Sequence, residues 1–253
     1  MRALFLMFLA ILLPVQVFAE QPSVVTLTPD NTLTLYGAVN EEMVEYVAKK
    51  LPTLTSSTVY VQLFSPGGAV FSGKRVIDQL VAVQAQGKQV VCVAHVAVSM
   101  AFVILQSPAC QVRHVVSGAI LMQHQASATV SGPIHQLLSS VHSLILELQE
   151  LNEMQAKRIG IPVDTFNNMV QHDLWINSGS RALSLNVADS TILALCDSKL
   201  VKRGEREDVT IGRIKLTATR SECPYVVQPK VEVIRYEETT ITELKYEQDA
   251  GKN

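Results

Sequence analysis

The sequence is short of charge and lacks the signatures that mark nucleotide or zinc chemistry. Charged residues make up 17% of its 253 residues, and 21 basic residues nearly balance 23 acidic ones, for a formal net charge of -2. No basic patch or arginine-rich run occurs, so nucleic acid is a poor candidate partner. There is no GxxxxGKS or GxxxxGKT phosphate loop, no HExxH helix, and no CxxC or CxxH pair, so we expect neither a cofactor nor a metal site.

Apolar residues, in contrast, are plentiful. Hydrophobic residues form 48% of the chain, which is ample for a packed core and argues against disorder. The length fits one large domain or two small ones, and no internal repeat or low-complexity tract divides the chain.

The first nineteen residues predict a secretory signal peptide. Arg2 supplies a positive start, an apolar stretch covers 4–15, and Val17-Phe18-Ala19 places small residues before a cleavage site. The alternative is an uncleaved anchor, but about 12 to 15 apolar residues are short for a membrane span, which needs roughly 20. We therefore expect an exported protein, periplasmic or secreted.

Export from the cytosol would affect the oxidation state of the four cysteines. Outside the cytosol an even number suggests one or two disulfides, and two disulfides allow three connectivities. Proximity in the sequence favours Cys92 with Cys110 and Cys196 with Cys223. Cys92 could equally be a buried free thiol in a strand.

The chain alternates strand and helix patterns up to about residue 123. Runs of β-branched and apolar residues predict strands at 24–35, 58–64, 89–94, 110–116 and 119–123. Helical spacing predicts a helix capped by Asn40 and further helices at about 73–87 and 99–106. This rhythm predicts an α/β protein with a mostly parallel sheet and helices on its faces.

The remainder is organised differently. Apolar residues repeat at helical spacing over 133–159, which predicts either a core helix or a protruding helix that packs against another subunit. Beyond Asp189 the pattern becomes β-like and more charged, and it ends in a polar tail from Glu247. We expect a β-rich extension and tail over 196–253.

Three clusters carry the candidate chemistry. Two glycines after a strand, in Ser65-Pro66-Gly67-Gly68, let the backbone turn its N–H groups outward, as an oxyanion hole requires, although the motif also suits a plain turn. Ser99, before Met100, starts an apolar helix, where a serine is most often only a cap. His124, in Met122-Gln123-His124-Gln125, closes an apolar strand, and most such histidines are structural.

In this order and spacing the three clusters resemble the ClpP family of serine peptidases. Ser99 lies 31 residues after Gly68, and His124 lies 25 residues after Ser99. The family has an SPGG oxyanion loop, a nucleophilic serine followed by methionine, and a histidine within a Met-x-His-Gln strand. The predicted helix at 133–159 falls where the family has its handle helix. His172-Asp173-Leu174-Trp175 is similar to the family's Arg-Asp-x-Phe segment, and the resemblance covers roughly 33–195.

The resemblance implies a ClpP/crotonase-like ββα superhelix with a long protruding handle helix, in a peptidase domain over 20–195. It makes Ser99 the nucleophile, His124 its base and Asp173 the residue that orients the histidine. Asp164 and Asp189 are rivals for the third role. The resemblance further assigns the oxyanion hole to the N–H groups of Gly68 and Met100. It assigns substrate contacts to Ser65, Pro66, Gly67 and Gln125.

Departures from the family pattern bear on function. His95-Val96-Ala97-Val98 replaces Gly-Gln-Ala-Ala before the serine, and Ala126 replaces a proline. His95 lies four residues before Ser99 and could sit near the site, but a packing or surface difference is favoured; Lys74 is interpreted as a surface residue at a helix start rather than a catalytic base. An exported chain cannot use a cytosolic ATP-driven unfoldase, so no such partner is expected and peptides or unfolded segments would be cleaved without ATP. We also expect a homo-oligomer through the 133–159 helix.

Two other functions remain open. One is a catalytically silent oligomeric scaffold that binds peptides in its cleft. The other is a crotonase-like thioester enzyme, which would bind coenzyme A and would not need Ser99.

Overall fold

The computed structural model describes residues 23–202, 204–211, 214–223 and 230–235. The predicted signal peptide at 1–19 and the polar tail from Glu247 therefore lie outside the described residues. Within that part of the chain, no helix combines the length and the apolar character that crossing a membrane requires.

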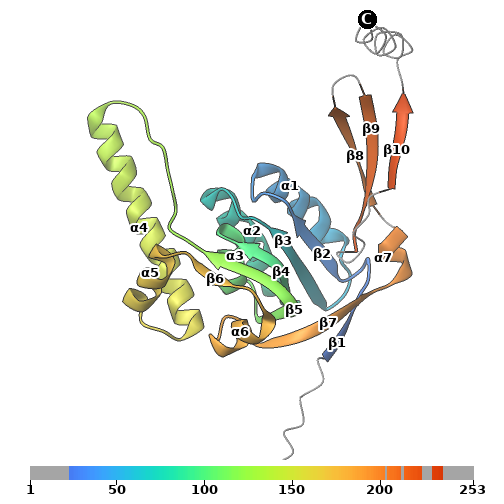
Figure 1. The fold of residues 1–253 in the computed structure, drawn as a ribbon, viewed down its shortest axis with the longest axis horizontal. Helices are drawn as coiled ribbons and strands as arrows, with labels where there is room; N and C mark the ends of the chain where they lie inside the picture. The colour runs from blue at the N-terminus through green and yellow to red at the C-terminus, as the bar shows by residue number, and fades with distance from the viewer. Residues whose placement is uncertain (1–22, 203, 212–213, 224–229, 236–253) are drawn as a thin grey trace, which may run out of the picture.

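A largely parallel sheet of seven strands forms the centre of the molecule (Figure 1). Its strand order is β1-β7-β5-β4-β3-β2, all neighbours being parallel, and β6 pairs antiparallel with β5. These strands are β1 (Ser23–Leu27), β2 (Thr32–Tyr36), β3 (Thr58–Ser65), β4 (Gln89–Val98), β5 (Val112–Gln123), β6 (Leu174–Ile176) and β7 (Ser190–Cys196).

The main core lies between this sheet and the first three helices. These are α1 (Glu41–Lys50), which continues into the short 3-10 turn η1 (Leu51–Thr53), α2 (Val70–Ala85) and α3 (Met100–Gln106). Strand β3 shows how the sequence selects this face, because Val59, Val61 and Leu63 alternate along it and are fully buried in the core cluster. A smaller apolar cluster on the sheet includes Leu27, Val93 and Leu200.

Local sequence signals explain most element boundaries. Asn40 caps α1, as predicted, because its side-chain oxygen accepts a hydrogen bond from the Met43 N–H at 3.0 Å. Helix α2 starts at Val70, three residues earlier than predicted. Gly73 is thus inside the helix rather than at its start, and a side chain there would collide with Met100. The glycine permits close packing of α2 on α3.

Two strand predictions were wrong in detail. The run at 24–35 forms two strands, because a turn in which Asn31 N–H donates to the Thr28 carbonyl at 3.2 Å divides it. The runs at 110–116 and 119–123 form the single strand β5. The predicted break between these runs corresponds to a gap in the pairing of β5 with β4, which covers 112–115 and resumes at Ile120.

Strand β4 contains one extra residue. Its register with β5 shifts between Ala94 and Val96, and its register with β3 shifts at the same point. His95 is the residue that neither neighbour pairs, so it forms a bulge four residues before Ser99.

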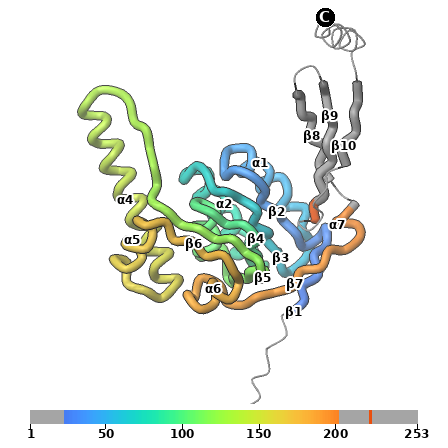
Figure 2. The backbone as a smooth tube through the Cα atoms, in the orientation of Figure 1, coloured from blue at the N-terminus to red at the C-terminus, as the bar shows by residue number. Residues whose placement is uncertain are grey.

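The long helix α4 (Ile134–Ile159) extends away from the sheet in Figure 1, and Figure 2 shows its sheet-proximal end beside α5 (Val163–Gln171). Only Gln155, Ala156 and Ile159 of this helix are buried. Most of this helix is therefore outside the core of the described chain, and its packing against another subunit stays a prediction. It is followed along the chain by α5, β6 and α6 (Gly179–Ser184).

The C-terminal part begins with α7 (Ser198–Lys202) and contains an antiparallel sheet of β8 (Gly204–Ile211), β9 (Ile214–Ser221) and β10 (Lys230–Arg235). Glu222 and Cys223 attach the chain after β9 to the main domain. Cys223 forms a disulfide with Cys196 at the end of β7, and Glu222 forms an ion pair with Lys50 at 3.0 Å.

Candidate active site

Ser99 occupies the sharp turn between β4 and α3. Its backbone has φ 56° and ψ -121°, a positive-φ conformation that is uncommon for a residue with a side chain. The Ser99 N–H donates to the Met122 carbonyl at 2.8 Å, which fixes the turn against β5. Such strained strand-to-helix turns expose a side chain at the end of a sheet and occur preferentially at functional sites.

His124 follows directly after β5, which is the neighbour of β4. Parallel strands end at the same edge of a sheet, and the register pairs Val98 with Met122, so the residues that follow each strand meet. The structure places His124 Nε2 2.9 Å from Ser99 Oγ, within hydrogen-bond distance. Residues 25 apart in the sequence thus form the contact that a nucleophile and its base require.

Asp173 lies immediately before β6. Strand β6 runs antiparallel to β5 and pairs Leu174 with Gln123, so Asp173 and His124 each adjoin a residue of the last printed pair. Asp173 is exposed and has φ 54°. In the described part of the chain no hydrogen bond joins its side chain to His124. The two rivals lie elsewhere: Asp164 is exposed in the first turn of α5, and Asp189 binds Arg113.

The glycine loop after β3 is held against the start of α1. The Val39 N–H donates to the Gly67 carbonyl and the Ala69 N–H donates to the Val39 carbonyl, both at 2.8 Å. Across the described residues, the N–H groups of Gly68 and Met100 donate no hydrogen bond. Two free donors beside Ser99 are what stabilisation of an oxyanion needs.

Gly67 must be glycine for this loop to approach Ser99. It has φ 88°, and a Cβ added to it would lie 2.6 Å from Ser99 Cβ and 2.8 Å from the Met100 nitrogen. Any larger residue would push the loop away from the nucleophile turn.

A cavity of about 440 Å³ opens beside Ser99 and His124. Of the predicted substrate contacts, Gln125 lines it, whereas Ser65, Pro66 and Gly67 do not. Sequence reasoning missed the opposite wall, which α4 provides. The lining residues from the glycine loop, the two strand ends and α4 are Gly68, Ala69, Val70, Ser99, Met100, Val103, Gln123, His124, Gln125, Ala126, Ser127, Leu148, Leu151, Asn152 and Gln155.

The missed wall had a signal in the sequence. Leu148, Leu151 and Gln155 recur at helical spacing, so they share one face of α4, but the pattern alone does not say what that face contacts. His95 and Lys74, which lie close to the motifs in the sequence, do not line the cavity. Lys74 donates to Glu147 of α4 at 2.7 Å, and this hydrogen bond raises the pKa of the lysine.

His95 is a buried packing residue. Its ring lies 4.1 Å from the ring of Phe64 in a stacked arrangement, and its Nε2 is 2.8 Å from Gln62 Oε1. Burial lowers the pKa of His95 from 6.5 to about 4, so the ring is neutral at physiological pH. No cluster of three His, Cys, Asp or Glu side chains that could hold a metal ion occurs among the described residues.

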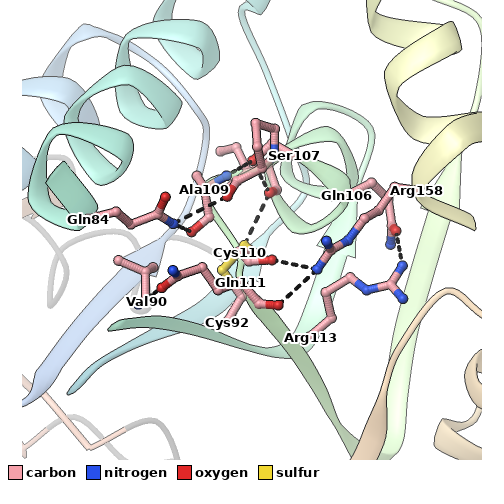
Figure 3. The surroundings of a disulfide bond; sticks show 12 residues. Gln84, Val90, Cys92, Gln106, Ser107, Ala109, Cys110, Gln111, Arg113 and Arg158 are labelled. Atoms are coloured by element: carbon pink, nitrogen blue, oxygen red, sulfur yellow. Dashed lines mark hydrogen bonds between the residues drawn. A yellow bond between two sulfur atoms is a disulfide. The ribbon is translucent and has the colours of Figure 1, made fainter. Parts of the chain in front are cut away.

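A disulfide joins Cys92 to Cys110 (Figure 3). Cys92 of β4 is bonded to Cys110 after α3, and the 18-residue separation spans Ser99 and all of α3. Arg158 of α4 donates to the carbonyl oxygens of Cys110 and Gln111 at 2.8 and 3.0 Å. The structure therefore contains both cysteine pairs that proximity favoured, and Cys92 is not a free thiol.

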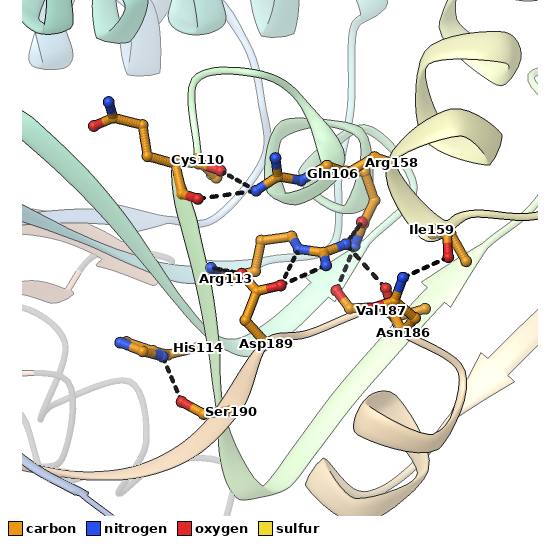
Figure 4. A network of polar contacts seen from close by, with 11 residues as sticks. Gln106, Cys110, Arg113, His114, Arg158, Ile159, Asn186, Val187, Asp189 and Ser190 are labelled. Carbon is orange, nitrogen blue, oxygen red and sulfur yellow. Dashed lines mark hydrogen bonds and ion pairs between the residues drawn. The ribbon is translucent and has the colours of Figure 1, made fainter.

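A buried polar network includes Gln106, the last residue of α3 (Figure 4). Arg113 of β5 binds Gln106 of α3 at 2.7 Å and the Asn186 carbonyl at 3.0 Å, in addition to Asp189. Burial alone would raise the pKa of Asp189, but its hydrogen bonds from Arg113 lower it. The network joins α3, β5 and the start of β7, so Asp189 acts in the fold rather than at Ser99.

Comparison with known proteins gives a consistent result. The family model for Clp protease matches residues 20–192. The chain is also similar to the ATP-dependent Clp protease proteolytic subunit 3 of Rhodococcus jostii (strain RHA1). The two are 26% identical over 171 residues, which cover 66% of this chain and 83% of the relative.

Proposed function

Because this chain belongs to the Clp protease family, we propose that it hydrolyses peptide bonds through Ser99, with His124 as general base. One observation carries the proposal: the 2.9 Å contact between Ser99 Oγ and His124 Nε2 at the edge of a cavity. A peptide carbonyl bound beside Ser99 would be attacked by Oγ as the hydroxyl proton passes to Nε2. His124 then gives this proton to the departing amine, and water releases the acyl group from Ser99 in a second, equivalent step.

Two further roles complete the proposed mechanism. Gly68 and Met100 would donate their N–H groups to the oxyanion of the tetrahedral intermediate, which is supported by the absence of another acceptor for either group in the described residues. Asp173 would hold the His124 ring through Nδ1 and stabilise its charged form. The antiparallel pairing of Gln123 with Leu174, the residues that adjoin His124 and Asp173, supports this assignment.

The proposed enzyme works in an oxidising compartment and without ATP. Two disulfides in one chain are typical of exported proteins, because cytosolic thiols are kept reduced. An exported peptidase has no access to a cytosolic ATPase, although the Rhodococcus relative is named ATP-dependent. Fractionation of cells that express the chain, with sequencing of its mature N-terminus, tests this: recovery of the cytosolic, uncleaved form would contradict export.

We further propose that α4 joins subunits. Large apolar side chains on its outer half are exposed, including Ile134 at 73% and Leu138 at 65% of their surface. A surface helix that carries so many apolar residues is expected to be covered by a partner. Replacing Leu138 by glutamate should lower the mass measured by light scattering, whereas an unchanged mass would exclude this helix from the interface.

The decisive test of the activity is labelling with a serine-reactive fluorophosphonate. The wild type should be labelled, and Ser99→Ala and His124→Ala should not. Ser127→Ala is the matched control, because Ser127 lines the same cavity without contacting His124, and it should be labelled like the wild type. A folded wild type that stays unlabelled would contradict the proposal, and binding of coenzyme A would then separate the thioester enzyme from the silent scaffold.

A further inference from the structure

We infer that the cavity selects glutamine or asparagine as the residue whose carbonyl is attacked. The inference rests on the proposed peptidase function and adds a substrate class to it. Consider a peptide whose carbonyl carbon lies at Ser99 Oγ and whose carbonyl oxygen lies at the Gly68 and Met100 N–H groups. The side chain of the residue that carries this carbonyl then lies beside the cavity. The chemistry of the cavity wall then decides which side chains are cleaved.

The inner wall carries an amide whose orientation is fixed. Gln123 Oε1 accepts the His124 N–H at 3.2 Å, and Gln123 Nε2 donates to Gln155 Oε1 at 2.7 Å. Because a backbone N–H can only donate, the oxygen of Gln123 must face His124. Gln155 is in turn held by its bond to the Leu151 carbonyl at 3.0 Å. Gln155 is 0% exposed and Gln123 is 5% exposed, so Gln123 is the amide that a ligand reaches, with Gln155 behind it.

These bonds leave part of the wall's hydrogen-bonding capacity unused. A side-chain amide nitrogen has two hydrogens, and Gln123 uses one of them. Asn152, also on the cavity wall, donates to Asn167 Oδ1 at 2.9 Å. Its own Oδ1 accepts no hydrogen bond from the described residues. Among the polar groups of the wall are therefore a donor from Gln123 and an acceptor from Asn152, and a carboxamide can bond to both.

Other side chains fit this wall less well. The described lining contains no Asp, Glu, Lys or Arg, so a charged side chain would lose water without gaining an opposite charge. An aliphatic side chain would bury the Gln123 and Asn152 amides without replacing their water, which costs free energy for each unpaired group. Val70, Val103 and Leu148 would contact the methylene groups of a glutamine.

The test is cleavage of fluorogenic peptides that differ only in the residue before the cleaved bond. We expect the wild type to prefer glutamine and asparagine to leucine by at least about tenfold in kcat/KM. The double variant Gln123→Leu and Gln155→Leu removes both amides together, so that neither is left buried and unpaired. It should reverse the preference towards leucine. Asn152→Leu, at a partly exposed position, is a second variant that should reduce the preference for amides even if the double variant does not fold.

Gln86→Leu is the matched control, since Gln86 is exposed at the end of α2 and away from the cavity. It should keep the wild-type preference. A wild type that reacts with fluorophosphonate but prefers leucine, or shows no preference, overturns the specificity alone. A folded wild type that does not react overturns the peptidase function, and the inference with it.

Discussion

The Asp189 carboxylate accepts three hydrogen bonds from Arg113, whose backbone N–H, Nε and Nη2 donate at 2.7, 3.2 and 2.6 Å. Arg113 is only 3% exposed, so the carboxylate neutralises a buried cation. Asp189→Asn should therefore lower the free energy of unfolding by about 3 kcal/mol. Urea denaturation measures this, and Asp78→Asn on the exposed side of α2 should change it by less than about 0.5 kcal/mol.

Asp173→Asn, unlike Asp189→Asn, should reduce activity without lowering the free energy of unfolding. Asparagine tolerates the left-handed backbone found at this position, and the side chain is exposed. Loss of the charge that stabilises the imidazolium should lower kcat/KM at least about a hundredfold. Kinetics and thermal unfolding of the same sample distinguish the two roles. A variant with full activity would remove Asp173 from the mechanism.

Gly67→Ala should disable the site, because its new methyl group would lie 2.6 Å from Ser99 Cβ. Gly87→Ala is the matched control: Gly87 has nearly the same φ, 85° against 88°, but nothing lies within 4 Å of an added Cβ. Both variants should lose about 1 kcal/mol to backbone strain. Only Gly67→Ala should lose fluorophosphonate labelling, and equal labelling of both would mean that close approach of the loop is unimportant.

The two disulfides should differ in their effect on activity. Replacing Cys92 and Cys110 by alanine opens the segment that carries Ser99 and should cost about 3 kcal/mol in unfolding free energy. It should also slow labelling of Ser99, since the strained turn loses a covalent support. Replacing Cys196 and Cys223, which attach the C-terminal part, should cost stability but leave the labelling rate unchanged well below the melting temperature. Equal labelling rates in both variants would contradict a role for the first disulfide at the turn.

His95 should make stability depend on pH. Its pKa is about 4 in the folded chain and 6.5 ordinarily, so between these values the unfolded chain binds a proton that the folded chain does not. Stability is thus complete above pH 6.5 and falls as the pH drops to about 4, by about 3 kcal/mol at most. Denaturation at a series of pH values should show a shallower decline for His95→Gln. His135→Gln, at the exposed start of α4, should follow the wild type, and identical slopes in all three would refute the assignment.

The sequence predicted the elements that present Ser99 and His124, because each follows an apolar strand and carries a motif of defined spacing. The alternation in β3 and the Asn40 cap are local features, readable within a few residues. The turn after Thr28 was missed although Pro29-Asp30-Asn31 is a local turn signal. The continuous β5 was misread because its continuity depends on how neighbouring strands pair.

The wall of the cavity could not be predicted for the same reason. Asn152 and Gln155 belong to α4, which forms one wall of the cavity only in the folded chain. Gln155 bonds to Gln123, 32 residues earlier in the sequence, and Asn152 bonds to Asn167 of another helix, α5. Composition and periodicity describe which residues share a helix face, not which distant face they meet.

The extra residue at His95 decides on which side of the sheet the Ser99 hydroxyl lies. Before it, Cys92 and Ala94 point to the helices; after it, Ala97 does, so the alternation of the strand has changed from even to odd numbers. Ser99 follows directly after this strand, so the change in alternation also determines the face on which its side chain lies. Deleting one residue here would restore an unbroken ladder with β3 and rotate the hydroxyl to the opposite face, away from the cavity and its histidine. In this strand, an irregular length is therefore a condition for activity, and an idealised redesign of β4 would be expected to fold and yet be inert.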